Sequence, residues 1–139
     1  MVLGNGENRM ALITDAKYYT QEHEWVQIDR DHIATIGITD FAQESLGDIT
    51  YVQLPKEGDD VKKDDPFGVV ESVKAVSDLY APVTGRVVEV NQPLLTAPEL
   101  INEDPYTDGW LIKVEVKDNS DIEGLMSESE YKEYIEDKA

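Results

Sequence analysis

The feature that most constrains the fold of this chain is a series of short runs of strand-forming residues, each broken by turn residues. Residues 25–28 and 32–36 are two such runs, and the charged segment 29–31 between them predicts a β-hairpin. Further runs follow at residues 49–54, 67–70, 79–80, 86–90 and 110–116. Many short strands separated by glycine, proline and acidic turns favour a barrel or sandwich over a parallel sheet, so we expect a mainly β fold.

One short helix is predicted inside this β pattern. Thr39 and Asp40 offer an N-cap, and Gly47 can end the helix in a left-handed conformation. Residues 91–109 contain three prolines and are expected to form a loop.

The C-terminal part of the chain changes period and predicts helices over about residues 120–137. Ser127 and Glu130 form a capping box at the start of the second of these helices. The apolar stripe of that helix, which should dock on the β core, consists of Tyr131, Tyr134 and Ile135.

The length of 139 residues fits one domain. We expect this domain to span residues 10–139, with its β core at about 18–117. Residues 1–9 carry two glycines, two asparagines and no periodicity, so they are expected to be a disordered leader or a remnant of cloning before a native start at Met10.

Acidic residues outnumber basic ones by 30 to 12, which gives a formal net charge of −18. Such a polyanion repels nucleic acid and anionic membranes and attracts a basic protein partner. The absence of cysteine excludes disulfides, thiolate metal sites and a cysteine nucleophile. No apolar run approaches the roughly 20 residues of a membrane span. No transit peptide is recognisable, so we expect a bacterial cytoplasmic protein, with a mature mitochondrial matrix form left open.

Enzymatic motifs are missing: the sequence has no nucleophile elbow, phosphate loop or dinucleotide-binding motif. His23 lies between Glu22 and Glu24, so it is either a base or ligand, or a polar strand end packed on Trp25. His32 starts a strand and is given no function. The sequence therefore predicts a protein without an active site of its own.

The most informative segment is residues 71–78, which separates two strand-forming runs. Lys74 therefore falls at or near a hairpin tip, and the small residues Ser72 and Ala75 leave its amine open to approach. Such a lysine is usually a solvated cation, but an exposed amine is also a target for acylation. An acylated Lys74 becomes a long tether on a rigid β platform, which suits a carrier that presents one group to several enzymes.

This segment is one of several motifs that follow one another in a fixed order. They are His23–Trp25, Ala34–Thr39, Leu46–Asp48, Glu71–Ala75 with Ser77–Asp78, Ala81–Val87, Leu100–Asn102, Pro105–Tyr106 and Gly109–Trp110. In this order they resemble the H protein family of the glycine cleavage system, over about Tyr18 to Lys138. The Lys-Ala pair alone is a weak signal, whereas the ordered set is specific.

The resemblance implies a barrel-sandwich hybrid, the hammerhead of lipoyl and biotinyl domains, with lipoate in amide linkage to Lys74. It implies a carrier rather than an enzyme. The carrier receives methylamine from the pyridoxal-phosphate glycine decarboxylase (P protein) and delivers it to the tetrahydrofolate-dependent aminomethyltransferase (T protein). Dihydrolipoamide dehydrogenase (L protein) reoxidises the arm, and a lipoate ligase or lipoyl transferase attaches it. We expect a monomer.

The resemblance also places a cleft beside the segment that contains His23 and Glu24. We expect Glu24, and then Asp78, to be rim carboxylates that shelter the loaded cationic arm through charge-assisted hydrogen bonds. Glu71 and Asp78 bracket Lys74 and are expected to mark it for the modifying enzyme.

Three other classes of carrier protein share this expected fold and are alternatives. A biotin carrier is disfavoured because Val73 and Ala75, rather than methionines, flank Lys74. A lipoyl domain of a 2-oxoacid dehydrogenase is disfavoured because the chain ends in helices 65 residues after Lys74, without a linker. An H-like protein that acts mainly as a lipoyl donor in protein lipoylation stays open.

Overall fold

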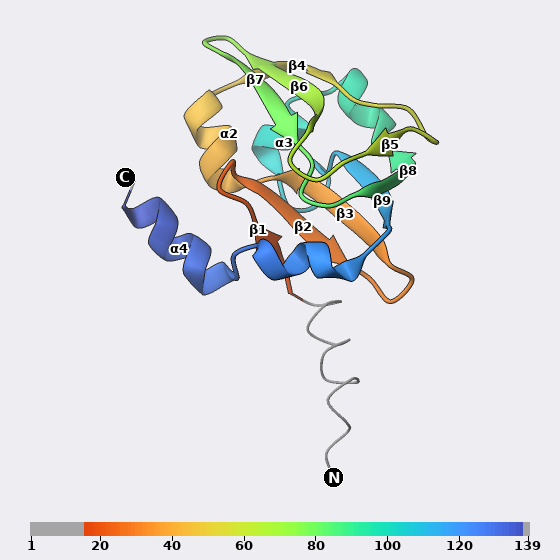
Figure 1. Ribbon diagram of the computed structural model, residues 1–139. Helices are drawn as coiled ribbons and strands as arrows, with labels where there is room; N and C mark the ends of the chain where they lie inside the picture. The colour runs from red at the N-terminus through yellow and green to blue at the C-terminus, as the bar shows by residue number, and fades with distance from the viewer. Residues whose placement is uncertain (1–15, 138–139) are drawn as a thin grey trace.

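The computed structural model describes residues 16–137, apart from the side chain of Asn119, and the expected leader 1–9 lies outside this range. The described chain forms two antiparallel sheets joined by short helices and turns (Figure 1). The six-stranded sheet has the order β1 (Tyr18–Tyr19), β2 (Glu24–Ile28), β3 (Ile33–Ile38), β9 (Ile112–Val116), β8 (Gly85–Val90) and β5 (Asp60–Val61). The three-stranded sheet has the order β4 (Ile49–Gln53), β6 (Pro66–Ser72) and β7 (Val76–Tyr80). The mainly β prediction is confirmed.

The inward side chains of both sheets form one apolar core. Val26 lies opposite Ile36 in the β2–β3 hairpin, and Val52 lies opposite Val70 in the β4–β6 pair. All four side chains are at most 2% exposed. They are buried together because every second side chain of a strand points to the same side of its sheet. The hairpin expected from residues 25–28 and 32–36 is therefore confirmed.

The pairing of β8 with β9 requires a residue without a side chain at Gly85. A Cβ atom added there would collide with the carbonyl oxygen of Glu115 and would lie 2.7 Å from Cγ1 of Val114. The two strands therefore approach each other closely at this end of the larger sheet.

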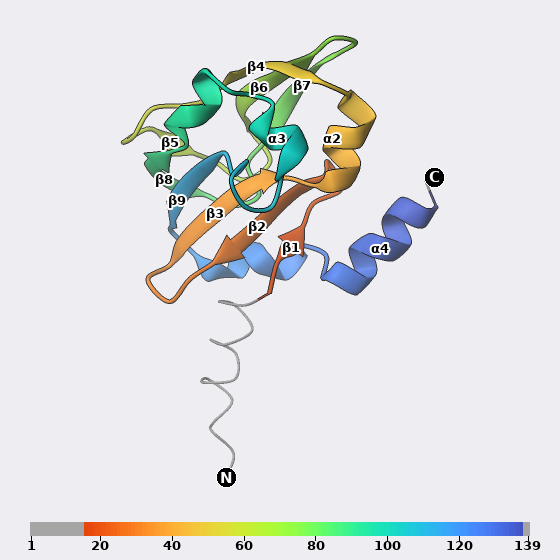
Figure 2. The ribbon, with the colours of Figure 1, turned by 180° about the vertical axis from the view of Figure 1, so that it is seen from behind.

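The predicted short helix is α2 (Asp40–Leu46), and it begins and ends as expected. Thr39 Oγ1 accepts a hydrogen bond from the amide of Ala42 at 3.2 Å. Gly47 follows the last turn with a φ of 81°, a conformation that glycine adopts without strain. Both ribbon views show α2 beside the β6–β7 hairpin (Figures 1 and 2).

The expectation that residues 91–109 form a loop is wrong in part. This segment contains the 3₁₀ helix η1 (Gln92–Leu95) and the one-turn helix α3 (Leu100–Glu103). Pro93 lies in the first turn of η1, where its missing N–H is not needed. Pro93 therefore lies at the beginning of a short helix instead of preventing one.

The C-terminal segment forms η2 (Asn119–Gly124) and α4 (Glu128–Glu136), and the Ser127–Glu130 capping box is present. Tyr131 is buried and stacks on Tyr19 of β1, with 4.6 Å between the ring centroids. The predicted docking of α4 is therefore confirmed, through an aromatic cluster beside the main core. None of the helices within residues 16–137 is long and apolar enough to cross a membrane.

Candidate functional site

The tip of the β6–β7 hairpin is a tight turn built around Ser72. The amide of Ser72 donates to the carbonyl oxygen of Ala75 at 2.8 Å. Ser72 Oγ accepts hydrogen bonds from the amides of Lys74 at 3.3 Å and Ala75 at 3.1 Å. Lys74 is exposed, and no ion pair among residues 16–137 involves it. The turn therefore presents the Lys74 amine to solvent, at the position that the sequence predicted.

Exposed apolar side chains surround this turn. Val73 is 74% exposed, Val76 70% and Tyr51 50%. Glu71 of β6 lies opposite Tyr51 on one side and opposite Val76 on the other. The side chains of Tyr51, Glu71 and Val76 therefore share the outer face of the smaller sheet. Exposed apolar residues beside an exposed amine are typical of a contact surface for a partner protein.

The two carboxylates that bracket Lys74 lie on this same outer face. Asp78 lies opposite Val69, two positions before Glu71, so both carboxylates point away from the core. Asp78 is exposed and Glu71 is half-buried. Within residues 16–137, neither forms an ion pair. Both remain open to a partner that approaches Lys74.

Glu24 is buried rather than placed at the rim of a cleft, which differs from the expectation. Its side chain is only 1% exposed. Oε1 accepts from Thr20 Oγ1 at 2.6 Å, and Oε2 accepts from the amide of Tyr80 at 3.1 Å. Burial raises the pKa of Glu24 to about 7. Glu24 therefore links β2 of the larger sheet to the end of β7, the strand that leads away from the lysine turn.

His23 belongs to the contacts that hold α4. Its Nδ1 lies 2.8 Å from the hydroxyl of Tyr131, which in turn lies 2.7 Å from Thr39 Oγ1. Burial raises the pKa of Tyr131 to about 12, so the hydroxyl keeps its proton at neutral pH. The imidazole packs on Phe41, with 4.7 Å between ring centroids.

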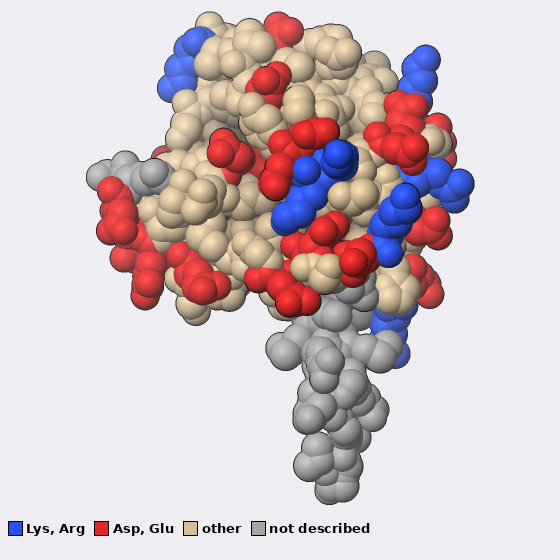
Figure 3. All heavy atoms as spheres, in the orientation of Figure 1, with Lys and Arg blue, Asp and Glu red and all other residues tan. Residues whose placement is uncertain are grey.

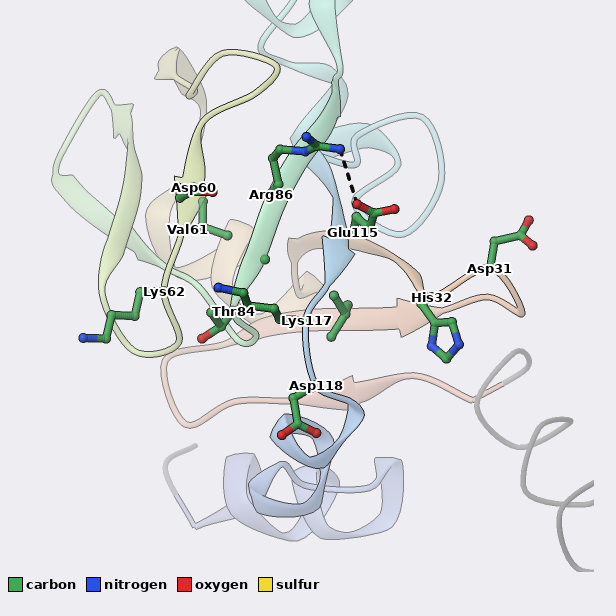
Figure 4. Close-up of a pocket in the computed structure, with 12 residues that line it drawn as sticks. Asp31, His32, Asp60, Val61, Lys62, Thr84, Arg86, Glu115, Lys117 and Asp118 are labelled. Atoms are coloured by element: carbon green, nitrogen blue, oxygen red, sulfur yellow. Dashed lines mark hydrogen bonds and ion pairs between the residues drawn. The ribbon is translucent and has the colours of Figure 1, made fainter.

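A groove of about 1120 Å³ lies elsewhere, between the β2–β3 turn, β5, β8 and β9 (Figure 4). His32 lies at its edge beside Asp31, and Arg86 forms an exposed ion pair with Glu115 at 3.4 Å. None of its lining residues belongs to the β6–β7 hairpin. Within residues 16–137 no cluster of histidine and carboxylate side chains is arranged to hold a metal ion. The candidate site is therefore the lysine turn.

Sequence reasoning missed the residues that support this site from a distance. Thr20, which holds Glu24, precedes the first motif, and its spacing of four from Glu24 is a weak signal at best. Asn102 belongs to the Leu100–Asn102 motif, in the segment expected to be a loop, and its missed role is to make three hydrogen bonds beneath the lysine turn. Nothing in its local sequence indicates those contacts.

Comparison with known proteins places this arrangement in a family. The family model described as glycine cleavage H-protein matches residues 17–138. The glycine cleavage system H protein of Carboxydothermus hydrogenoformans is 50% identical over 129 residues, which cover 93% of this chain and 98% of the relative. That of Halalkalibacterium halodurans is 58% identical over 120 residues, covering 86% and 93%.

The chain belongs to the glycine cleavage H-protein family. A crystal structure of a glycine cleavage system H protein from Mycobacterium marinum superposes with a TM-score of 0.79 at 39% identity, covering 88% of this chain and 96% of that one. The expected barrel-sandwich hybrid is thereby confirmed. H proteins carry lipoate covalently on a lysine, have no catalytic activity of their own and work with the P, T and L proteins of the glycine cleavage system.

Proposed function

We propose that Lys74 carries the lipoyl group with which this chain shuttles methylamine from the glycine decarboxylase to the aminomethyltransferase. One observation carries the assignment: in a chain of this family, the exposed amine of Lys74 lies at the tip of a tight turn fixed by Ser72. A rigid turn holds the attachment point still, while the arm beyond it is free to reach successive enzymes.

The modification needs only the amine that the turn presents. The Lys74 amine attacks the carbonyl carbon of a lipoyl adenylate made from lipoate and ATP. A C–N amide bond forms, the bond from carbonyl carbon to phosphate oxygen breaks, AMP leaves and the amine releases a proton. When bound, the lipoyl group supplies a pair of sulfur atoms that carries the aminomethyl unit between enzymes.

The carboxylates of the outer face have separate roles in this proposal. Glu71 and Asp78 lie beside Lys74 without ion-pair partners among the described residues, which supports a role in recognition by the lipoate ligase or lipoyl transferase. Asp78, being exposed, also suits the sheltering of a cationic loaded arm. Glu24 and His23 act indirectly, because their side chains are engaged by Thr20, Tyr80 and Tyr131.

The surroundings proposed for this carrier follow from its surface and its relatives. Figure 3 shows acidic side chains spread over the face in view, while basic ones gather mainly along one edge. A net charge of −18 supports encounter with basic surfaces on the partner enzymes. The matched relatives are bacterial, which supports a carrier in a bacterial cytoplasm, and the monomeric state stays a prediction.

The test is incubation of the full chain with a lipoate ligase, lipoate and ATP, followed by intact mass and peptide mapping. We expect one lipoyl group, located on Lys74, and none on the variant Lys74→Arg. Lys132→Arg is the matched control, because the Lys132 side chain is 67% exposed and lies on α4. Lipoyl addition to Lys74→Arg would contradict the assignment. Glu71→Gln and Asp78→Asn should slow the addition without lowering the melting temperature.

A further inference from the structure

Asn102 of α3 uses its whole side-chain amide to hold the turn between α2 and β4. Its Nδ2 donates to the carbonyl oxygen of Gly47 and to Oε1 of Gln43, both at 2.9 Å. Its Oδ1 accepts from the amide of Ile49, also at 2.9 Å. Both amide hydrogens and the carbonyl oxygen are engaged, so the path of residues 47–49 is fixed by one side chain.

Residues 47–49 in turn form the floor beneath the lysine turn. The carbonyl oxygen of Asp48 accepts from the amide of Val73 at 3.2 Å. Ile49 lies opposite Ser72 in the β4–β6 register, and Ser72 organises the turn itself. A Cβ atom added at Gly47 would lie 3.5 Å from Cε of Lys74, so the end of the lysine stem lies beside Gly47.

We propose that Asn102 is a positioning residue for Lys74, acting through the backbone of residues 47–49. The proposal rests on Lys74 being the lipoylated residue. Residues 73–76 are all exposed, so the tip has little packing of its own to restrain it. Its restraint comes from Ser72 within the turn and from the Asp48 carbonyl beneath it, and Asn102 fixes that carbonyl's peptide in place.

A positioning role predicts changes in the kinetics of lipoylation that differ from those expected of a residue needed only for stability. When the floor is loosened, the turn spends only part of its time in the conformation that the ligase binds. The apparent Kd of the ligase for the chain then equals the intrinsic Kd divided by the fraction of molecules in that conformation, while the chemistry of the bound complex is unchanged. Loss of Asn102 should therefore raise KM for the protein substrate and leave kcat nearly the same.

The experiment compares Asn102→Asp with Asn91→Asp in the full chain. In the first variant a carboxylate oxygen faces the oxygens of Gly47 and Gln43, so both donated hydrogen bonds are lost. Asn91 is a matched control, because its Nδ2 also donates to two oxygens, the carbonyls of Asp108 and Trp110, at 2.8 and 2.6 Å. Those contacts do not involve residues 47–49 or the β6–β7 hairpin.

Lipoylation kinetics are measured at a temperature where denaturation curves show all proteins folded. We expect Asn102→Asp to raise KM about tenfold with kcat within about twofold of the parent, and Asn91→Asp to change neither. Amide hydrogen exchange at Val73 should accelerate in Asn102→Asp alone. If Asn102→Asp does not fold, Asn102→Ser is used instead, because its side chain is too short to form the same hydrogen bonds and it adds no charge.

The outcomes separate this inference from the proposed function. An unchanged KM in Asn102→Asp, or an equal rise in Asn91→Asp, would overturn the positioning role while leaving Lys74 as the attachment site. If the parent chain itself is not lipoylated, or is lipoylated at another lysine, the proposed function fails first.

Discussion

Replacing the buried carboxylate of Glu24 with a neutral amide should stabilise the protein above neutral pH. The Glu24 side chain is 1% exposed and accepts hydrogen bonds from Thr20 and from the amide of Tyr80. These two hydrogen bonds lower its pKa, but desolvation by burial is the larger effect and raises the pKa from 4.5 to about 7. Glu24→Gln keeps the size and an acceptor oxygen for the Tyr80 amide while removing the charge.

The sign follows from proton binding. Between pH 4.5 and about 7 the folded protein binds the Glu24 proton more tightly than the unfolded chain does, so the free energy of unfolding falls as pH rises. The loss is absent below pH 4.5 and complete above about pH 7. At about 1.4 kcal/mol for each pKa unit, the full loss is roughly 3 kcal/mol. Glu24→Gln does not show this loss of unfolding free energy, because its side chain has no proton to release.

The assay is urea denaturation followed by tryptophan fluorescence, since Trp25 is buried beside this segment. The parent, Glu24→Gln and the control Glu57→Gln are compared at intervals from pH 5 to 8.5. The stability of Glu24→Gln relative to the parent should grow by about 2.5 kcal/mol across this range, because a small part of the loss has already occurred at pH 5. Glu57 is exposed and lies in the turn before β5, so its variant should track the parent. A difference between Glu24→Gln and the parent that does not change with pH would refute the reasoning.

Two further substitutions, each compared with a control variant, test the packing of the fold. Tyr131→Phe removes the hydroxyl that joins His23 to Thr39 and should cost about 1–2 kcal/mol of unfolding free energy in urea denaturation. Tyr51→Phe, whose side chain is 50% exposed, should cost under about 0.5 kcal/mol, and equal losses from the two tyrosine variants would contradict the network. Gly85→Ala should lower stability by about 3 kcal/mol or more, because its Cβ meets the Glu115 carbonyl. Gly124→Ala, where a Cβ meets nothing within 4 Å, should leave the melting temperature unchanged, and similar thermal melts for the two glycine variants would argue against the close approach.

The parts of the fold that the sequence predicted are those set by neighbours along the chain. The β2–β3 hairpin follows from alternating apolar residues around an acidic turn, and the Ser127–Glu130 capping box spans three positions. The exposed position of Lys74 follows in the same way, from two strand-forming runs separated by small and charged residues. In each case the residues that determine the structure lie close together in the sequence.

The features that the sequence did not predict depend on contacts between distant residues. Glu24 lies in a polar segment, and it is buried because the amide of Tyr80, 56 positions later, supplies a hydrogen-bond donor. The three partners of Asn102 lie 53 to 59 positions earlier. Pro93 predicts a loop from its local sequence alone, because its place in the first turn of a helix depends on the packing of the whole segment.

The helix that underlies Lys74 has a consequence for the order of folding. With seven residues, α2 is too short to be stable alone. At its N-terminus Thr39 contacts the hydroxyl of Tyr131, 92 positions later. At its C-terminus the carbonyl of Gly47 accepts a hydrogen bond from Asn102, 55 positions later. Closing loops of that length costs chain entropy that only the assembled protein recovers, so the helix forms late. During synthesis Lys74 leaves the ribosome before Asn102 and Tyr131, so we expect the proposed attachment site to become fully ordered only when the C-terminal helix has docked.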